Sequence, residues 1–294
     1  MTEKLRAYLY LHFCVFLAGF TAILGKLISL NAVPLVWWRV LLASSTLALI
    51  IPKKQWLGLS RSVFLQLFGI GSLVGLHWLC FYGAIKLSNA SVAVATMATT
   101  SFFAALVGPL LLREKVKWYE IGLGLLILPG MALVVGNINW DMQVGFGVGI
   151  VSALLAAIFS TLNKKVLEQK PPPPLVMSFV ELFAATCVCS LILPFLMWYA
   201  PEMPVLPTPQ DWIWLLVLVW LCTLLPYYLT LQAMRHVSAF TANLTINLEP
   251  VYGVLLAAVL FREDKELDPH FYLGMLVILL AVFSHPFLKN IFEK

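Results

Sequence analysis

Two apolar stretches decide the fold: residues 90–112, ASVAVATMATTSFFAALVGPLLL, and residues 238–261, SAFTANLTINLEPVYGVLLAAVLF. Each is long enough to cross a bilayer as a helix, because ~20 apolar residues are sufficient. Arg-Glu follows each stretch directly, at Arg113-Glu114 and at Arg262-Glu263, and the same offset relates Lys86 to Arg235. These matches fall on polar residues, which an apolar composition does not supply. The chain therefore contains an internal repeat.

The composition of the whole chain predicts a membrane protein. The 294 residues are 61% hydrophobic and 11% charged, with a mean hydropathy of +0.93, whereas soluble domains carry ~25% charged residues. Short polar breaks separate ten apolar runs, which predict an all-α integral membrane protein with ten transmembrane helices. These runs are residues 7–29, 34–51, 63–85, 90–112, 118–135, 144–162, 175–199, 212–234, 238–261 and 271–288.

The repeat divides these helices into two sets of five, residues 1–137 and residues 144–294. Five is odd, so the second set is predicted to enter the membrane inverted relative to the first. Inverted repeats with a site near the midplane of the bilayer are typical of secondary transporters, which work by alternating access.

Basic residues predict the orientation, since cytoplasmic loops carry an excess of Lys and Arg. Fourteen of the 19 basic residues fall on the side of the termini, four fall on the other side, and Arg39 lies within a span. We therefore expect a plasma (inner) membrane protein with both termini in the cytoplasm. On this reading Lys53 and Lys165 are cytoplasmic, and Asp141, Pro207 and Asp268 are external. The net charge of +5 reflects this loop bias and does not indicate nucleic-acid binding.

Several of these features resemble those of a known family. Ten spans, the repeated Arg-Glu ends, Asn247-Leu248-Glu249-Pro250 and the intramembrane Trp38-Arg39 are similar to EamA-type members of the drug/metabolite transporter superfamily. The resemblance covers essentially the whole chain and implies export of amino acids, related metabolites or drugs. One departure is that Thr100-Ser101 stands in the first repeat where Glu249-Pro250 stands in the second.

The ninth predicted span holds the deepest carboxylate, Glu249. An ionisable side chain at the centre of a membrane costs ~2.5–3.5 kcal/mol, so Glu249 needs either a transport role or a bond to another helix. At 100° per residue, a polar face is expected to line a wet cavity; its members are Ser238, Thr241, Thr245, Glu249 and Tyr252. Asn243 and Asn247 project to nearly the opposite face, where hydrogen bonds between helices are expected, and Pro250 is predicted to form a hinge.

Other candidate residues lie in the second, third and seventh spans. Arg39 suits a substrate carboxylate or phosphate, because its guanidinium presents a fork of donors. Alternatively it pairs with Glu181, which is expected at similar depth in the seventh span, or reaches the outer interface. His77 either relays a proton or packs through a hydrogen bond. The remaining predicted pathway residues are the aromatic side chains Trp38, Trp78 and Tyr82.

Several motifs argue for close packing and against catalysis. Gly71-x-x-x-Gly75 and Gly145-x-x-x-Gly149 predict close contact between helices, and the five cysteines fall in apolar runs. We find no phosphate-binding loop, no His-Glu-x-x-His and no Gly-x-Ser-x-Gly. We therefore expect no enzyme activity, no cofactor and no metal. Glu263, Asp264, Glu266 and Asp268 are interpreted as a solvated cluster, and a channel or a membrane-embedded lipid enzyme is disfavoured.

The sequence thus predicts a secondary transporter that exports small metabolites, amino acids or related compounds being favoured because Arg39, Glu181 and Glu249 supply both signs of charge. The alternative is a multidrug or a sugar or nucleotide-sugar carrier of the same architecture. The expected partners of the protein are a small-molecule substrate and the lipid bilayer, and the chain is expected to be a monomer or a homodimer. Glu249 is a candidate for coupling transport to protons.

Overall fold

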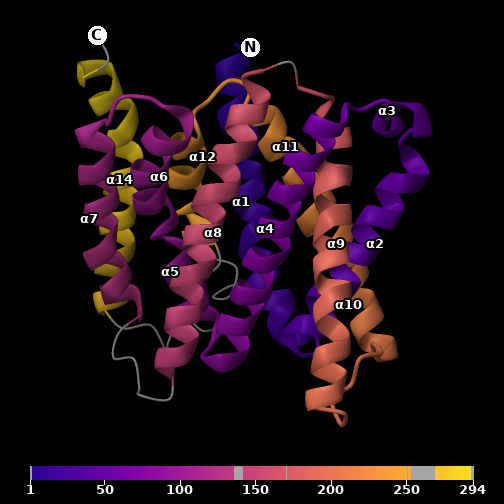
Figure 1. Cartoon of the computed structure of the whole chain (residues 1–294). Helices are drawn as coiled ribbons and strands as arrows, with labels where there is room; N and C mark the ends of the chain where they lie inside the picture. The colour runs from indigo at the N-terminus through magenta and orange to yellow at the C-terminus, as the bar shows by residue number, and fades with distance from the viewer. Residues whose placement is uncertain (1, 136–141, 170, 250, 253–268, 293–294) are drawn as a thin grey trace.

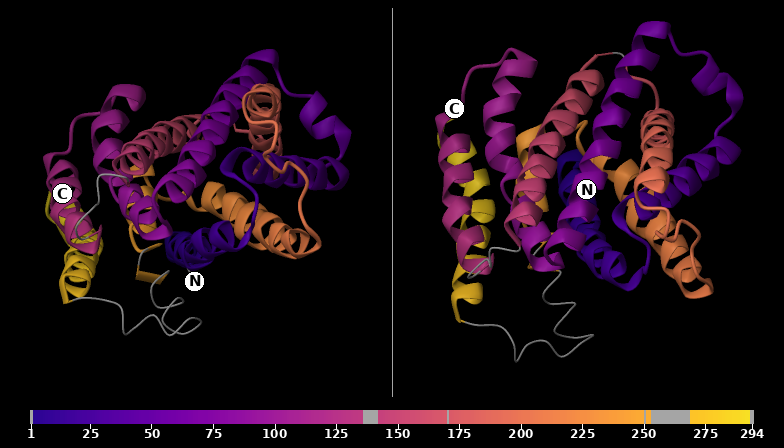
Figure 2. Two further views of the ribbon diagram at one scale, coloured as in Figure 1. Left: turned by 90° about the horizontal axis from the view of Figure 1, so that it is seen from below. Right: turned by 60° about the horizontal axis from the view of Figure 1, so that its bottom comes forward.

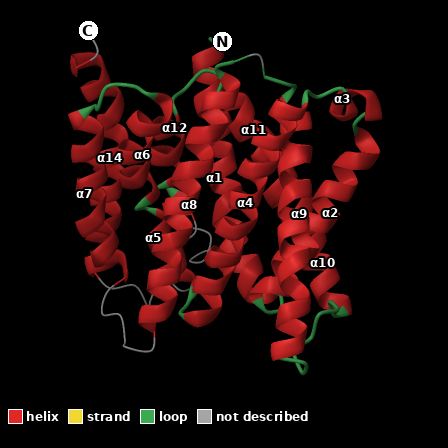
Figure 3. Cartoon of the chain, in the orientation of Figure 1, coloured by secondary structure: helices red, strands yellow, loops and turns green. Residues whose placement is uncertain are grey.

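A computed structural model describes residues 2–135, 142–169, 171–249, 251–252 and 269–292. Within these residues the chain is a bundle of helices with no strand (Figure 3). Pro250, Asp141, Asp268, the second Arg-Glu pair and the acidic cluster lie outside the described residues, so the predictions made for them are not addressed.

The helices of the first half follow the predicted spans closely. They are α1 (Glu3–Leu27), α2 (Ala32–Ile50), α3 (Lys53–Leu57), α4 (Arg61–Leu87), α5 (Ala90–Met97), α6 (Thr100–Leu112) and α7 (Trp118–Val135). Of these, α3 is a single short helix in a predicted polar break, and it was not anticipated.

The second half contains α8 (Gln143–Leu167), α9 (Pro174–Tyr199), α10 (Pro209–Val219), a π-helical turn (Trp220–Leu224), α11 (Leu225–Ala233), α12 (Ala239–Ile246) and α14 (Pro269–Phe292). Eight helical segments are long and apolar enough to span a membrane, and the apolar part of α7, Trp118–Leu133, is shorter. The all-helical, multi-pass architecture is therefore confirmed. The described part of the chain does not establish the predicted count of ten, because residues 238–261 run beyond it.

Two spans predicted to be continuous are interrupted, and the interruptions are equivalent in the two repeats. Asn89 Oδ1 caps α5 by accepting from Val92 N at 2.8 Å, and Ser238 Oγ caps α12 by accepting from Thr241 N at 3.1 Å. These are strong N-cap residues. Each capped helix has eight residues. The last residues of α5 and α12, Met97 and Ile246, are as far apart along the sequence as the two caps are.

The interruptions have a local cause in threonine side chains. At the first, Ala98 N and Thr99 N donate to carbonyls only three residues back, at 3.1 Å each. Thr96 Oγ1 and Thr99 Oγ1 both donate to carbonyls of the preceding turn, at 2.7 Å. Such bonds compete with regular α-helical hydrogen bonding. The hydrophobic pattern alone does not reveal this competition, which is why the prediction of unbroken helices was wrong.

Contacts between helices repeat in the two halves of the chain. In the first half α4 packs on α8 and α9, while its counterpart in the second half, α10–α11, packs on α1 and α2. The helices α7 and α14 pack against each other at one edge of the bundle, as Figures 1 and 2 show.

Glycines allow the closest of these contacts. A Cβ added to Gly71 would collide with the backbone of Glu181 in α9, and a Cβ on Gly75 would lie 3.1 Å from Ala185 Cα. On α8, Gly145 and Gly149 meet Ser88 and Thr96 in the same manner. The prediction that both Gly-x-x-x-Gly motifs serve helix packing is therefore confirmed.

The start of α1 and the end of α14 lie at the same end of the bundle, together with α3 (Figure 1). Two contacts bring basic connections to this end. His236 Nε2 lies 3.7 Å from Glu3 Oε2, and Lys164 Nζ donates to Met234 O at 3.0 Å. The connection between α9 and α10, which contains Pro207, lies at the opposite end.

Candidate substrate cavity

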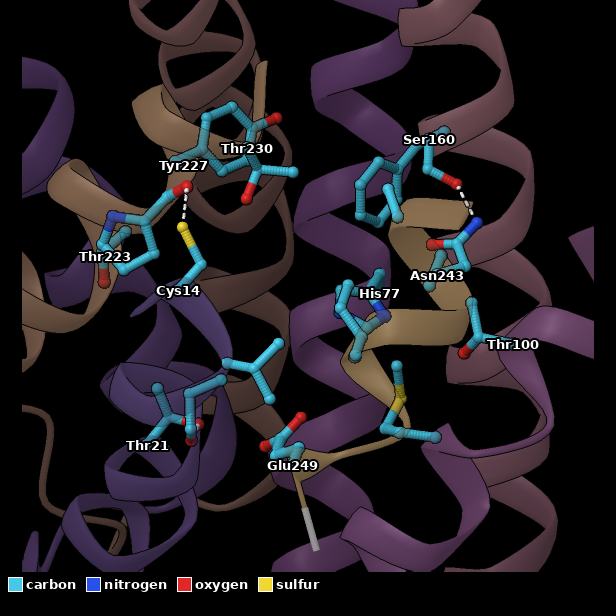
Figure 4. Close-up of a pocket in the computed structure, with 18 of the residues that line it drawn as sticks. Cys14, Thr21, His77, Thr100, Ser160, Thr223, Tyr227, Thr230, Asn243 and Glu249 are labelled. Carbon is cyan, nitrogen blue, oxygen red and sulfur yellow. Dashed lines mark hydrogen bonds between the residues drawn. The ribbon is translucent and has the colours of Figure 1, made fainter. Parts of the chain in front are cut away.

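A cavity of about 190 Å³ runs through the centre of the bundle, between the two repeats. Its wall is built by α1, α2, α4, α5, α6, α8, α11, α12 and the π-helical turn. Leu11 and Met234 line it toward the end that carries the termini, and Thr21, Arg39 and Glu249 line it deeper down. Figure 4 shows side chains from both repeats converging on this space.

Arg39 is the cation of the cavity, and its position depends on a defect in the helix opposite. The residue is 4% exposed. Its Nε donates to Thr223 Oγ1 at 2.7 Å, and its Nη2 donates to Cys222 O at 3.4 Å. Cys222 O is free to accept because Pro226, four residues later, has no N–H to offer it. The π-helical turn at Trp220–Leu224 thus presents both acceptors to Arg39, as π-bulges often do at functional sites.

Aromatic rings hold the other side of the guanidinium. Arg39 Cζ lies 4.0 Å from the centre of the Trp78 ring and 5.6 Å from that of Tyr82, within the range of cation–π attraction. Arg39 Nη1 donates to Tyr82 Oη at 3.0 Å. Among the described residues, these bonds occupy three of the five N–H groups of a guanidinium. Two therefore remain for a ligand.

Glu249 provides a carboxyl group in the same cavity. It is 6% exposed and follows the interruption after α12. No ion pair within 4.0 Å joins Glu249 and Arg39, both of which are described residues. In Figure 4 its carboxylate faces the open space and carries no dashed line. Thr100, the counterpart of Glu249 in the first repeat, also lines the cavity, and its buried Oγ1 has no hydrogen-bond partner among the described residues.

His77 contributes to the wall beside Thr100. Its Nδ1 lies 2.9 Å from both the carbonyl oxygen and the hydroxyl of Ser152 in α8. Its ring packs against Phe159, with centroids 5.4 Å apart. The ring is thus hydrogen-bonded on one side while it lines the cavity on the other, so the structure accommodates either of the two predicted roles.

The two asparagines of the α12 region bond across the boundary between helices. Asn243 Nδ2 donates to Ser160 Oγ at 2.8 Å, a contact visible in Figure 4. Asn247 Nδ2 donates to Ser101 Oγ, also at 2.8 Å, and so links the second interruption to the start of α6. Asn243 also lines the cavity.

Glu181 lies behind the cavity wall and is fully buried. Its Oε2 accepts from Asn163 Nδ2 at 3.0 Å and from the hydroxyl of Tyr227. It does not pair with Arg39 in this structure. The expectation that Arg39 and Glu181 lie at the same level in the membrane was wrong. Each residue lies seven positions, about 10 Å, after the start of its own helix, but α2 and α9 start at opposite ends of the bundle.

Other predicted pathway residues lie outside the cavity. Trp38 Nε1 donates to Val205 O at 2.8 Å near the end opposite the termini. The hydroxyl of Tyr252 lies 3.4 Å from His12 Nδ1, and that of Thr245 donates to Thr241 O. A single polar face containing Thr245 and Glu249 is therefore not found, because the interruption at Asn247 changes the helical phase.

Further lining residues were not predicted from the sequence, among them Asn163, Cys222, Thr223 and Tyr227. One signal was available for two of them: a proline inside an apolar span, Pro226, frees the carbonyl oxygen four residues earlier. No comparable signal marks Asn163 or Tyr227, whose roles arise only from packing between α8, α9 and α11.

A family model described as the EamA-like transporter family matches residues 5–136 and again residues 143–284. The chain belongs to this family. The EamA-family protein is also 25% identical over 293 residues to a Bacillus subtilis (strain 168) protein named "Uncharacterized transporter YetK", covering 96% of this chain and 87% of the relative. Among solved structures, one described only as "Crystal structure of protein" has a TM-score of 0.72 at 16% identity, covers 98% of this chain and 99% of its own, and shows a shared fold. The predicted family and a general transport role are confirmed.

Proposed function

We propose that this EamA-family protein exports small zwitterionic metabolites, amino acids or closely related compounds, by alternating access. The observation that carries the proposal is that a guanidinium, Arg39, and a carboxyl group, Glu249, line one buried cavity, and no ion pair within 4.0 Å joins these two described residues. Desolvating a charge is costly, so a cavity that keeps two separated charges suits a ligand that carries both complementary charges.

The geometry supports a defined pose for such a ligand. A substrate carboxylate would bind the two remaining N–H groups of Arg39, because a guanidinium can hold a carboxylate through parallel hydrogen bonds. The substrate ammonium would face Glu249. Trp78 and Phe159 offer apolar wall to the substrate side chain. A phosphorylated substrate would call for more than one cation, and in the described lining Arg39 is the only Lys or Arg.

The alternating-access mechanism is supported by a set of contacts that closes the end of the bundle opposite the termini. Asp211 at the start of α10 accepts from Ser29 N and Ser29 Oγ, both at 2.7 Å, in the connection between α1 and α2. Lys86 Nζ donates to Ile28 O at 3.2 Å beside them. We propose that these contacts form the outer gate, and that they separate when the carrier opens outward.

We propose further that this outer end is external and that the termini are cytoplasmic in the plasma membrane. Lys53, the last turn of α8 with Lys164, and the connection that contains Arg235 lie at the end of the termini, which agrees with the preference for positive charge on the cytoplasmic side. In a cysteine-free background, an impermeant maleimide applied from outside should label Pro207→Cys and not Lys53→Cys. The reverse pattern would invert the assignment.

The test of function is a substrate screen on the purified protein in liposomes. Flux of radiolabelled amino acids, sugars and cationic dyes would be compared with flux into empty liposomes. We expect amino-acid exchange well above the empty-liposome level. Amino-acid flux no greater than that of empty liposomes, with sugar or dye flux above it, would replace this proposal by a sugar or multidrug carrier of the same fold.

A further inference from the structure

The structure contains a second buried carboxylate whose position the proposed substrate site does not explain. Glu181 is 0% exposed and Asn163 is 2% exposed. Asn163 and Tyr227 line the cavity, and both donate to Oε2 of Glu181. The carboxylate therefore lies one side chain behind the cavity wall. Glu181 lies seven residues after the start of α9, and α9 starts at the end of the bundle that carries the termini, whereas Arg39 lies seven residues after the start of α2, which starts at the opposite end.

No positive charge in the described part of the chain compensates this carboxylate. Among the described residues, no Lys, Arg or His lies within 4.0 Å of it; the ion pairs that are formed involve other residues. Of the elements packed around Glu181, α2 contributes Arg39, which is bonded elsewhere, and α4 contributes His77, which is bonded to Ser152. The basic residues Lys53, Lys54, Arg61, Lys86 and Lys165, on α3, α4 and α8, are exposed. Lys164, next to Asn163, bonds Met234 O and Glu168.

Two acceptor oxygens in this cluster lack partners. Glu181 Oε1 and Asn163 Oδ1 are buried, and neither has a hydrogen bond among the described residues. Buried polar atoms are almost always hydrogen-bonded, so an exception calls for a missing group. A charged carboxylate buried without a partner cation is also strongly unfavourable. A water would supply the missing hydrogen bond but would not compensate the charge, whereas a proton or a cation at Oε1 would do both.

The bonds at Oε2 select which cation fits. Asn163 Nδ2 and the Tyr227 hydroxyl direct their hydrogens at Oε2, so they repel a metal ion there. Only Oε1 and Asn163 Oδ1 are left as ligands. Ca²⁺ and Mg²⁺ require six or more oxygen ligands, while a proton requires one oxygen and one acceptor. The cluster therefore matches a proton.

We propose that Glu181, positioned by Asn163 and Tyr227, is a proton-binding site that couples transport to the proton gradient, and that it is distinct from the Arg39–Glu249 substrate site. In the binding step, a hydronium ion that enters the cavity gives its proton to Oε1, forms the O–H bond there and leaves as water. The coupling role rests on the proposed transport function, whereas proton binding does not.

The first experiment uses the proton itself as the probe and needs no substrate. Infrared difference spectra of the purified full-length protein between acidic and alkaline pH should contain a protonated-carboxyl band that is absent in Glu181→Gln. The band should be kept in Glu168→Gln, a matched change at an exposed carboxylate on the helix cap of α8, and shifted in Tyr227→Phe, which removes a bond to Oε2. An unchanged band in Glu181→Gln would overturn the proposal, as would a band removed by sodium at constant pH.

The second experiment tests coupling in proteoliposomes with a mixture of radiolabelled amino acids. An imposed pH gradient should drive at least ten-fold accumulation by the unsubstituted protein and by Glu168→Gln. Glu181→Gln should retain exchange without a gradient but lose the accumulation. Accumulation retained by Glu181→Gln, or absent from the unsubstituted protein despite exchange, would refute the coupling role. If no amino acid exchanges at all, the transport proposal fails, while the infrared band still decides whether Glu181 binds a proton.

Discussion

Replacing Asp211 by Asn should weaken the outer gate by a predictable amount. Asp211 Oδ1 accepts from Ser29 N, while Oδ2 accepts from Ser29 Oγ and from Thr208 N and Oγ1. The bonds to Thr208 are local to the start of α10 and persist when the gate opens. Only the two bonds to Ser29 separate on opening, so only they determine the effect on the equilibrium between closed and open states.

The magnitude follows from the chemistry of the amide. With its oxygen in the place of Oδ2, the amide introduced by Asp211→Asn would turn its NH₂ group toward Ser29 N–H and lose that bond. A hydrogen bond to a charged group contributes about 1.5–3 kcal/mol, and the remaining bond to Ser29 Oγ would become neutral and weaker. We expect a loss of about 2 kcal/mol in the closed state. This corresponds to a roughly 30-fold rise in the ratio of open to closed molecules.

Cysteine labelling from outside measures this ratio. Thr21 is 7% exposed and lines the cavity near its deeper end, so Thr21→Cys in a cysteine-free background reports outward opening. An impermeant maleimide should label this cysteine roughly 30-fold faster when Asp211→Asn is also present. The control is Glu202→Gln, which removes an exposed carboxylate in the connection that precedes α10. Equal labelling rates with and without Asp211→Asn would refute the assignment of this cluster as a gate.

Three further predictions concern packing, backbone strain and the cavity. Gly71→Ala should lower the melting temperature, since its Cβ collides with the Glu181 backbone and overpacking costs about 1–3 kcal/mol. The control Gly69→Ala, whose Cβ meets nothing within 4 Å, should not lower it. Equal melting temperatures of the two variants would contradict the contact. Arg113 ends α6 with a φ of 58°, so Arg113→Gly should stabilise the fold by about 1 kcal/mol in thermal unfolding, and destabilisation would show that the side chain matters more than the strain. Arg39→Lys should raise the KM for amino acids about ten-fold or more, because an ammonium cannot hold a carboxylate bidentately; an unchanged KM would remove Arg39 from the site.

The sequence was informative wherever one physical signal dominated. Apolar runs located the spans because a bilayer requires their length. The glycine motifs located the close helix contacts, and Arg39 and Glu249 were identifiable because charges within a span are rare. These signals act along a single helix or depend on composition.

Other features depended on competition or on packing and could not be predicted in this way. The interruptions after Met97 and Ile246 arise because threonine hydroxyls compete for backbone carbonyls. Helical projection across the second interruption therefore placed Thr245 with Glu249 incorrectly. The partners of Glu181 come from α8 and α11, and their register against α9 is a property of the folded bundle.

The central claim, that the cavity recognises a zwitterion, is tested most directly by competition with ligands that lack one charge. Uptake of a radiolabelled amino acid by proteoliposomes would be measured against the unlabelled amino acid, its methyl ester and its deaminated acid. In the proposed pose Arg39 binds the carboxylate and Glu249 the ammonium. Each neutralised end should therefore weaken competition about ten-fold or more, which corresponds to at least about 1.4 kcal/mol. Equal competition by the ester, the acid and the parent amino acid would contradict recognition by Arg39 and Glu249.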